Sequence, residues 1–149
     1  MKTLCLMVLI MTLIFVGNPF CMAAGPEYIG IVKSLSGDVV VLRNNSSVRA
    51  EGNMKLRQGD HVRTGANGKA GLIFEDDTVI AIGPNSSIVI DSFLFQPNEK
   101  KLSFIARIIQ GTASYLSGQI AKLAPNNVRL ETPHATVGMR GTHLLVKVD

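Results

Sequence analysis

The sequence is poor in aromatic residues, in cysteine and in charge. Its 149 residues include no tryptophan, two tyrosines and two cysteines, and only 17% are Asp, Glu, Lys or Arg. The shortage of aromatic rings argues against a carbohydrate site built on stacked aromatic platforms. Hydrophobic residues reach 46%, so the low charge is not that of a disordered chain. The length allows one domain with a core of ordinary size.

The first 24 residues have the pattern of a secretory signal peptide. One positive residue precedes an apolar run at residues 4–16, and a helix-breaking Gly-Asn-Pro follows it. A membrane-spanning helix needs about 20 apolar residues, so this run is too short to span a bilayer. We predict cleavage after Ala23 or Ala24, which gives residues 1–24 as the signal peptide and residues 25–149 as the mature domain.

Both cysteines, Cys5 and Cys21, lie in this leader and would be removed with it. The mature chain then has no disulfide, no thiolate metal site and no cysteine nucleophile, as is common in a bacterial periplasm. We expect a periplasmic or secreted bacterial protein with no stable membrane span after signal removal. An uncleaved anchor and a lipoprotein modified at Cys21 are the alternatives, although Phe20 is a poor residue before a lipidated cysteine.

The basic residues are dispersed along the mature chain. Loss of Lys2 with the leader lowers the formal net charge by one, from +4 to +3, and Lys100-Lys101 is the only adjacent basic pair. Proteins that bind nucleic acid gather such charges on one stripe of their surface. The sequence therefore predicts a mildly basic, solvated surface and no nucleic-acid partner.

The mature chain predicts an all-β single domain. Short apolar or β-branched runs recur every ~8–12 residues between Gly, Asn, Asp and Pro turns, which is typical of a β-solenoid-like or sandwich-like fold. The predicted strands are 28–32, 38–43, 48–50, 61–64, 69–74, 78–82, 87–95, 102–109, 112–116, 128–131, 135–137 and 143–148. Only residues 118–123 indicate a short helical turn. Gly37-Asp38 recurs as Gly59-Asp60, a weak repeat of about the length of a solenoid rung.

Four motifs resemble the FecR domain in order and spacing. They are GDHVRTG at 59–65, AGLIFEDDT at 70–78, GPNS at 83–86 and ETPHATVGMRGT at 131–142. The match extends over about residues 30–148. The resemblance implies a β-rich, solenoid-like periplasmic domain that contacts partner proteins. In the family's best-known members, this domain follows a cytoplasmic anti-sigma domain and a membrane helix. There it relays the occupancy of an outer-membrane transporter to a sigma factor.

This chain departs from that plan at both ends. Only three residues precede the apolar run, and nothing follows Asp149. We therefore expect neither the cytoplasmic regulatory domain nor the C-terminal module that contacts the transporter. On this reading the chain does not signal across a membrane by itself.

The last motif supplies the candidate structural or partner-contact residues. They are Thr132, Pro133, Gly138, Arg140, Gly141 and Thr142. Arg140 lies close to two glycines, where backbone can pass nearby or adopt a positive φ. Its guanidinium could contact a partner's carboxylate or phosphate, or donate to loop carbonyls and lock the last turns, and we favour the second role. The threonines are interpreted as turn or strand hydroxyls, and Pro133 as fixing the entry of the next strand.

No catalytic, cofactor or metal site is predicted. The histidines are not spaced as a pair of metal ligands at i, i+2 or i, i+4 would be; they are His61, His134 and His143. We interpret the acidic triplet at 75–77 as a solvated hairpin turn rather than a calcium site. The sequence has no Gly-x-Ser-x-Gly elbow, phosphate-binding glycine loop or His-Glu-x-x-His. A Ser-His-Asp triad assembled from distant residues stays open.

These observations favour a non-enzymatic exported envelope module of the FecR-domain type. We expect it to bind or scaffold another envelope protein, in connection with signalling or transport, through exposed strand edges or glycine-rich loops. The alternative is a binder of cell-wall glycan or peptidoglycan, which a basic surface favours and the lack of aromatic platforms disfavours. A small hydrolase is the third hypothesis.

Overall fold

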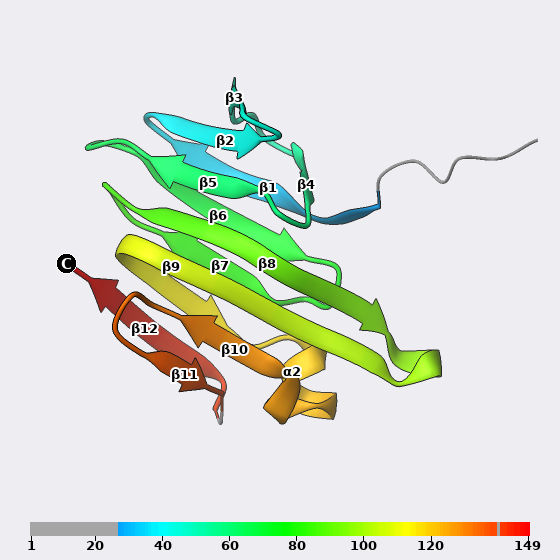
Figure 1. The fold of residues 1–149 in the computed structure, drawn as a ribbon. Coiled ribbons are helices and arrows are strands. Elements are labelled where there is room, and N and C mark those ends of the chain that lie inside the picture. The colour runs from blue at the N-terminus through cyan, green and yellow to red at the C-terminus, as the bar shows by residue number, and fades with distance from the viewer. Residues whose placement is uncertain (1–26, 140) are drawn as a thin grey trace, which may run out of the picture.

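A computed structural model describes residues 27–139 and 141–149 (Figure 1). The predicted signal peptide, residues 1–24, lies outside the described residues, and so does Arg140. Within the described part of the chain, no helix has the length and apolar character needed to cross a membrane.

The described chain consists of strands and three short helical segments. The strands are β1 (Tyr28–Ser36), β2 (Val39–Arg43), β3 (Ser46–Arg49), β4 (Lys55–Arg57), β5 (His61–Thr64), β6 (Lys69–Phe74), β7 (Val79–Ile82), β8 (Ser87–Gln96), β9 (Lys101–Leu116), β10 (Val128–Glu131), β11 (Thr136–Gly138) and β12 (His143–Val148). The helical segments are η1 (Pro97–Glu99), α2 (Gln119–Leu123) and η2 (Pro125–Asn127). The prediction of an all-β domain with at most one short α-helix is confirmed.

Strand β9 joins two facing sheets into one curled, half-barrel sheet (Figure 1). Its first half pairs with β8 and β10, and its second half with β7 and β12. We call β3-β2-β5-β8-β9-β10-β11 the front sheet and β4-β1-β6-β7-β9-β12 the back sheet. The strand passes from front to back at Gly111, whose φ of 86° is a left-handed conformation that favours glycine. A Cβ there would lie 2.5 Å from the Cα of Ser86, so the bend also needs the missing side chain.

The turns that cross between the two sheets stack on one another. The Gly65 amide donates to the Asp38 carbonyl (2.8 Å), and the Asn85 amide donates to the Gly65 carbonyl (2.9 Å). The Gly83 amide continues the stack by donating to the Thr112 carbonyl (3.0 Å). Stacked turns thus connect the two facing sheets, so the fold has features of both alternatives, solenoid-like and sandwich-like, that the sequence left open.

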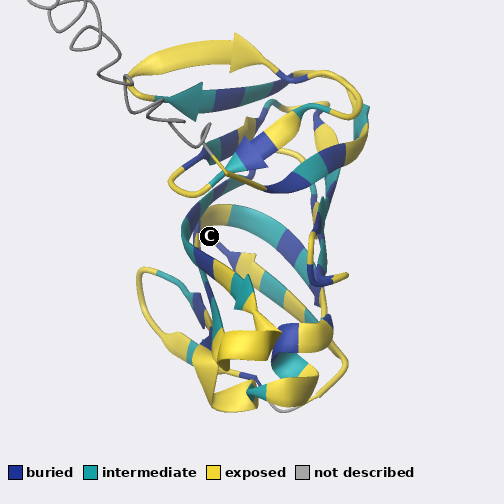
Figure 2. Cartoon of the chain, turned by 90° about the vertical axis from the view of Figure 1, so that its right-hand side faces the viewer, coloured by how far each residue is buried: buried dark blue, intermediate teal, exposed yellow. Residues whose placement is uncertain are grey.

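Side chains from alternate strand positions fill the space between the sheets. Figure 2 shows buried residues alternating with half-buried and exposed ones along the strands, as expected from the two-residue period of a strand. Phe74, Phe93, Phe104 and Tyr115 form an aromatic cluster at the centre, with ring centroids 5.1–5.9 Å apart in the contacting pairs. The remainder of the core is mainly Ile, Leu and Val.

A buried ion pair between Arg43 and Asp60 anchors the turn that leads into β5. Asp60 is 1% exposed and accepts hydrogen bonds from Nε (2.8 Å) and Nη2 (2.6 Å) of Arg43. The Arg57 amide donates to the same carboxylate (2.8 Å). The Asp60 hydrogen bond, and secondarily its charge, raises the pKa of Arg43 against the opposing effect of burial. Asp60 therefore ties β2 to the β4–β5 turn.

The acidic triplet at residues 75–77 is not a wholly solvated turn, so this prediction was wrong in part. Asp76 is fully buried. Its carboxylate is satisfied by hydrogen bonds from the Thr78 amide (3.1 Å) and hydroxyl (2.8 Å). It also accepts one from the amide of Ile120 (3.2 Å), at the start of α2. The side chain joins the β6–β7 turn to the short helix.

Candidate binding surfaces

The predicted C-terminal motif begins at the β10–β11 turn. The Thr132 hydroxyl accepts a hydrogen bond from the Ala135 amide (3.0 Å), and the Thr132 amide donates to the Ala135 carbonyl (2.8 Å). Pro133 is exposed in the same turn. Thr132 therefore has the geometry of a turn hydroxyl.

The rest of the motif follows the other end of β11. Gly138 ends that strand opposite Arg129, and Gly141 and Thr142 are exposed just before β12. The Thr142 carbonyl accepts a hydrogen bond from the Ser117 amide (2.9 Å). The described motif residues thus shape a crossing between the sheets and do not converge on one cavity. The role of Arg140 stays a prediction, since it lies outside the described residues.

The three histidines lie on different elements. His61 is in β5 and contacts the Ser87 hydroxyl (2.5 Å), while His143 is in β12 and contacts the Ser114 hydroxyl (2.7 Å). Neither ring forms a hydrogen bond with a carboxylate of residues 27–139 or 141–149. Those same residues contain no group of three or more His, Cys, Asp or Glu that could hold a metal ion.

The outer face of the back sheet carries two cross-strand rows without charged side chains. Strand registers align one apolar row, which consists of Ile31, Ile73, Val79 and Leu116. A second row consists of Ser34, Gly71, Ala81, Ser114 and Leu145. Cross-strand neighbours on one face lie within contact distance, so each row forms a continuous strip.

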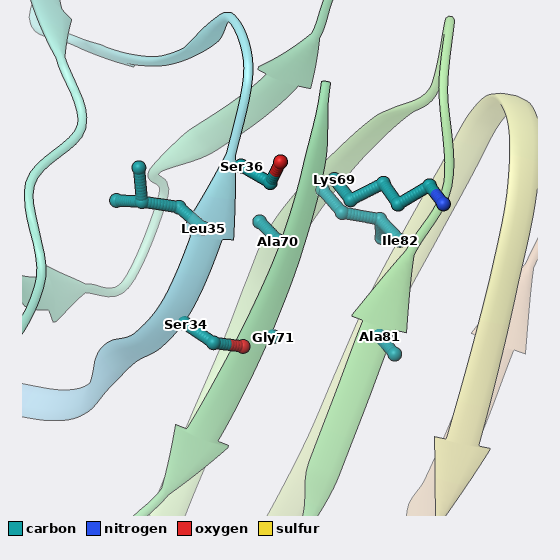
Figure 3. A pocket seen from close by; sticks show the side chains of 8 residues that line it. All are labelled: Ser34, Leu35, Ser36, Lys69, Ala70, Gly71, Ala81 and Ile82. Atoms are coloured by element: carbon teal, nitrogen blue, oxygen red, sulfur yellow. The ribbon is translucent and has the colours of Figure 1, made fainter. Parts of the chain in front are cut away.

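Small side chains in the second row leave a shallow hollow of about 290 Å³ over β1, β6 and β7. Figure 3 shows Ser34, Gly71 and Ala81 side by side on these three strands, with Lys69 and Ile82 towards the turn end. Leu145, at the far end of the row on β12, is 72% exposed. The two rows are therefore uncharged, whereas Lys69 and Lys147 lie at the margins of the same face, and the second row ends in the exposed Leu145.

Strand β12 is an open edge of the back sheet, since β9 is its one pairing partner among the described strands. Hydrogen-bonded and non-hydrogen-bonded residue pairs alternate along an antiparallel ladder. Because the Thr142 carbonyl faces β9, the backbone amides and carbonyls of His143, Leu145 and Lys147 face the open edge. The side chains of the same three residues lie on the outer face.

The outer face of the front sheet is basic. Four arginines occupy outward positions on β3, β5, β9 and β10, namely Arg49, Arg63, Arg107 and Arg129. Arg107 forms a forked ion pair with Asp91, and Arg49 lies 3.8 Å from Asp38. Arg63 and Arg129 form no ion pair within the described ranges. Basic residues that are dispersed in the sequence are thus gathered on one face, because separate strands contribute one each.

In a comparison with protein families, a model described as FecR protein matches residues 60–149. This region extends from β5 to β12 and contains three of the four arginines, the C-terminal motif and the open edge. The resemblance inferred from residue 30 onward is not matched before residue 60. No curated protein and no solved structure matches the chain.

Proposed function

The chain belongs to the FecR family, and we propose that it is a non-enzymatic exported envelope module that binds or scaffolds another envelope protein. The family is a regulatory and signalling family whose proteins are associated with the cell envelope. Export would follow from the signal peptide predicted at residues 1–24. The intact mass of the exported protein tests this, since it should begin at Ala24 or Gly25. A species that retains Met1, or that carries lipid on Cys21, would contradict it.

The observation that carries the proposal is the open edge of β12. Among the described residues, His143, Leu145 and Lys147 there combine backbone groups that face away from β9 with side chains on the outer face of the sheet. An extended segment of a partner can add to such an edge, with backbone hydrogen bonds giving affinity and alternate side chains giving specificity. Soluble proteins usually protect open edges with charged side chains, and β12 carries one, Lys147; the 72% exposed Leu145 on the same edge is the apolar feature that marks a contact surface.

Site-specific photo-crosslinking in the producing cell tests this contact. A photoreactive residue replaces Leu116, which is 44% exposed and lies opposite His143 in the ladder. We expect it to capture an envelope protein, whereas the same residue at Leu94, exposed on the front sheet, should capture none.

A second substitution shows whether the edge itself is used. Leu145→Pro removes an amide that faces away from β9, so it should block strand addition without breaking the existing ladder. It should reduce the crosslink at least tenfold with little change in thermal stability. Ser47→Pro, on the edge strand β3 of the front sheet, is the matched control. Equal crosslinking in wild type and Leu145→Pro would rule out the β12 edge.

A binder of cell-wall glycan or peptidoglycan is the second candidate, and the basic outer face of the front sheet supports it. Sedimentation of the purified domain with isolated cell wall, compared with pull-down from envelope extract, separates this function from protein binding. A small hydrolase has less support, because neither Ser–His contact has a hydrogen-bonded carboxylate among the described residues.

A further inference from the structure

A hollow of about 320 Å³ opens on the basic face of the front sheet, beside the turn at residues 83–86. It lies where β5, β8 and the first half of β9 meet, and none of the described residues that line it is Asp or Glu. Its volume falls at the lower end of the ~300–1,000 Å³ that is usual for sites that bind small molecules.

Two hydroxyl groups of the hollow are committed to the fold. Thr64 donates to the Gly83 carbonyl (2.7 Å), and its oxygen accepts from the Ser86 amide (2.9 Å). The Ser86 oxygen in turn accepts from the Thr112 amide (3.0 Å). These bonds join three stacked turns, so they fix the wall of the hollow and leave the two hydroxyls unavailable to a ligand.

Other polar side chains in the hollow are uncommitted. The side chains of Arg63, Asn85 and Gln110 form no hydrogen bond with any described residue, although all three line the hollow. The Ser87 hydroxyl, by contrast, is hydrogen-bonded to the His61 ring (2.5 Å). A guanidinium and two carboxamides therefore face solvent together on a wall that the fold holds in place.

The electrostatic environment is positive. Arg63 has no ion-pair partner among the described carboxylates, whereas Arg107, on the same face of the sheet, is paired with Asp91. Burial lowers the pKa of His61, and the charges of Arg63 and Arg107 lower it further. This shift favours the neutral imidazole, and Arg63 is the one Lys, Arg, Asp or Glu among the described residues that line the hollow.

We propose that this hollow binds an anionic sugar, with Arg63 holding its carboxylate or phosphate. A guanidinium matches both groups because its planar fork donates two parallel hydrogen bonds. Asn85, Gln110 and Ser87 can each donate and accept, which suits ring hydroxyls that do the same. Ile109, which is 39% exposed, offers an apolar contact for the ring carbons. The site would give the cell-wall alternative a defined ligand class.

The inference does not depend on the protein partner proposed for β12. The hollow lies on the outer face of the front sheet, and the β12 edge belongs to the back sheet. Failure of one proposal therefore leaves the other standing.

NMR titration of the ¹⁵N-labelled mature domain provides the test. Glucuronate and glucose 6-phosphate are the two probes, and they distinguish a carboxylate from a phosphate ligand. Either should shift the amide signals of Arg63, Asn85, Ser87 and Gln110 in a saturable way, while glucose should shift them at least tenfold more weakly. Arg63→Gln should weaken binding roughly tenfold or more, since it removes a charged hydrogen-bonding group.

Arg129→Gln is the matched control, because Arg129 lies on the same face but does not line the hollow. It should bind the sugars with wild-type affinity. Both variants should have the melting temperature of the wild type, because both arginine side chains are exposed. Unchanged binding by Arg63→Gln, or equal loss in the control, would overturn the site. Equal affinity for inorganic phosphate would show an ion site without sugar recognition and overturn the ligand class. Tighter binding of tetraglutamate than of either sugar would likewise overturn it in favour of an acidic protein.

Discussion

Removing the Arg43 side of the buried ion pair should destabilise the domain far more than removing an exposed pair of the same geometry. In Arg43→Met the aliphatic stem is kept, but the Asp60 carboxylate, 1% exposed, loses both of its guanidinium hydrogen bonds. The Lys55 carbonyl also loses its bond to Nη2 (2.9 Å). Breaking a buried pair by removing one partner typically costs ~3–5 kcal/mol, because a buried charge is left uncompensated. We expect a loss of about this size in the free energy of unfolding.

The pair between Arg107 and Asp91 is the matched control. It has the same forked arrangement, with Nε to Oδ2 at 3.0 Å and Nη2 to Oδ1 at 2.5 Å, but the side chains are 50% and 28% exposed. The corresponding side chains in the buried pair are 23% and 1% exposed. Exposed ion pairs contribute ~0–1 kcal/mol, so Arg107→Met should cost about that much.

Urea unfolding followed by far-UV circular dichroism measures both losses, provided that the dependence on denaturant is unchanged. The double variant Arg43→Met/Asp60→Asn should be more stable than Arg43→Met alone. It removes the unpaired charge and keeps an oxygen for the Arg57 amide, which donates to the carboxylate in the wild type. Equal losses in Arg43→Met and Arg107→Met would refute the reasoning, because forked geometry rather than burial would then determine the energy.

Three further predictions concern single side chains. Burial raises the pKa of Tyr115 to about 12, with Asp76 adding to the shift and Thr78 opposing it. The variant Tyr28→Phe leaves Tyr115 as the one tyrosine of the sequence. Its tyrosinate absorbance should appear with a midpoint near pH 12, and the free energy of unfolding should fall as pH rises from about 10. A midpoint near pH 10 would contradict the burial of Tyr115. The lowered pKa of His61 means that the unfolded chain takes up its proton first. Stability should therefore decrease as pH falls below about 6.5, and His61→Gln should reduce that decrease in acid-unfolding curves. Arg140→Ala should lower the melting temperature, and Arg140→Lys should restore part of the loss, whereas Lys100→Ala should leave the melting temperature nearly unchanged. If Arg140→Ala melts at the wild-type temperature but no longer binds an identified partner, Arg140 is a contact residue.

Local turn chemistry accounts for the parts of the fold that the sequence predicts well. Strands β5, β6, β10 and β12 begin and end at the predicted residues, because turn-forming residues bound their apolar runs. Asn44 and Asn45, which join β2 to β3, have φ of 48° and 63°, as expected of the Asn turns between the predicted strands. Such boundaries depend on a few neighbouring residues, so they can be predicted from the sequence alone.

Features that depend on distant contacts could not be predicted. Strand β4 has three residues and one buried side chain, which is too short to show a period. Residues 102–109 and 112–116 form one strand, because Gly111 bends the chain without interrupting the ladder. Asp76 is buried by a bond to Ile120, which is 44 residues further along the chain. No local pattern around the acidic triplet reports that contact.

The sequence led us to expect contact through an exposed strand edge, but not which residues form the candidate surfaces, although one signal was present. The sequence predicts the candidate contact residues in the C-terminal motif, whereas the candidate surfaces of the structure are formed by rows of residues from separate strands. An arginine flanked on both sides by buried residues occurs at Arg63, Arg107 and Arg129. In a strand this pattern places the arginine on the outer face. Three copies in one sheet therefore predict a basic face even where no two basic residues are adjacent.

The two proposed surfaces should act independently, because the packed core separates them. Facing sheets lie about 10 Å apart, and here Phe93, Phe104 and the other core side chains fill that space. Neither proposed contact requires an element to move, since the β12 edge is already open and the wall of the hollow is already hydrogen-bonded. A ligand changes affinity at a second site only when it favours one of two states of the protein. Saturating glucuronate should therefore leave the yield of the Leu116 crosslink unchanged, measured side by side with glucose. A change of fivefold or more, present in wild type and absent in Arg63→Gln, would show that β9, which is shared by both sheets, has a second arrangement that couples them.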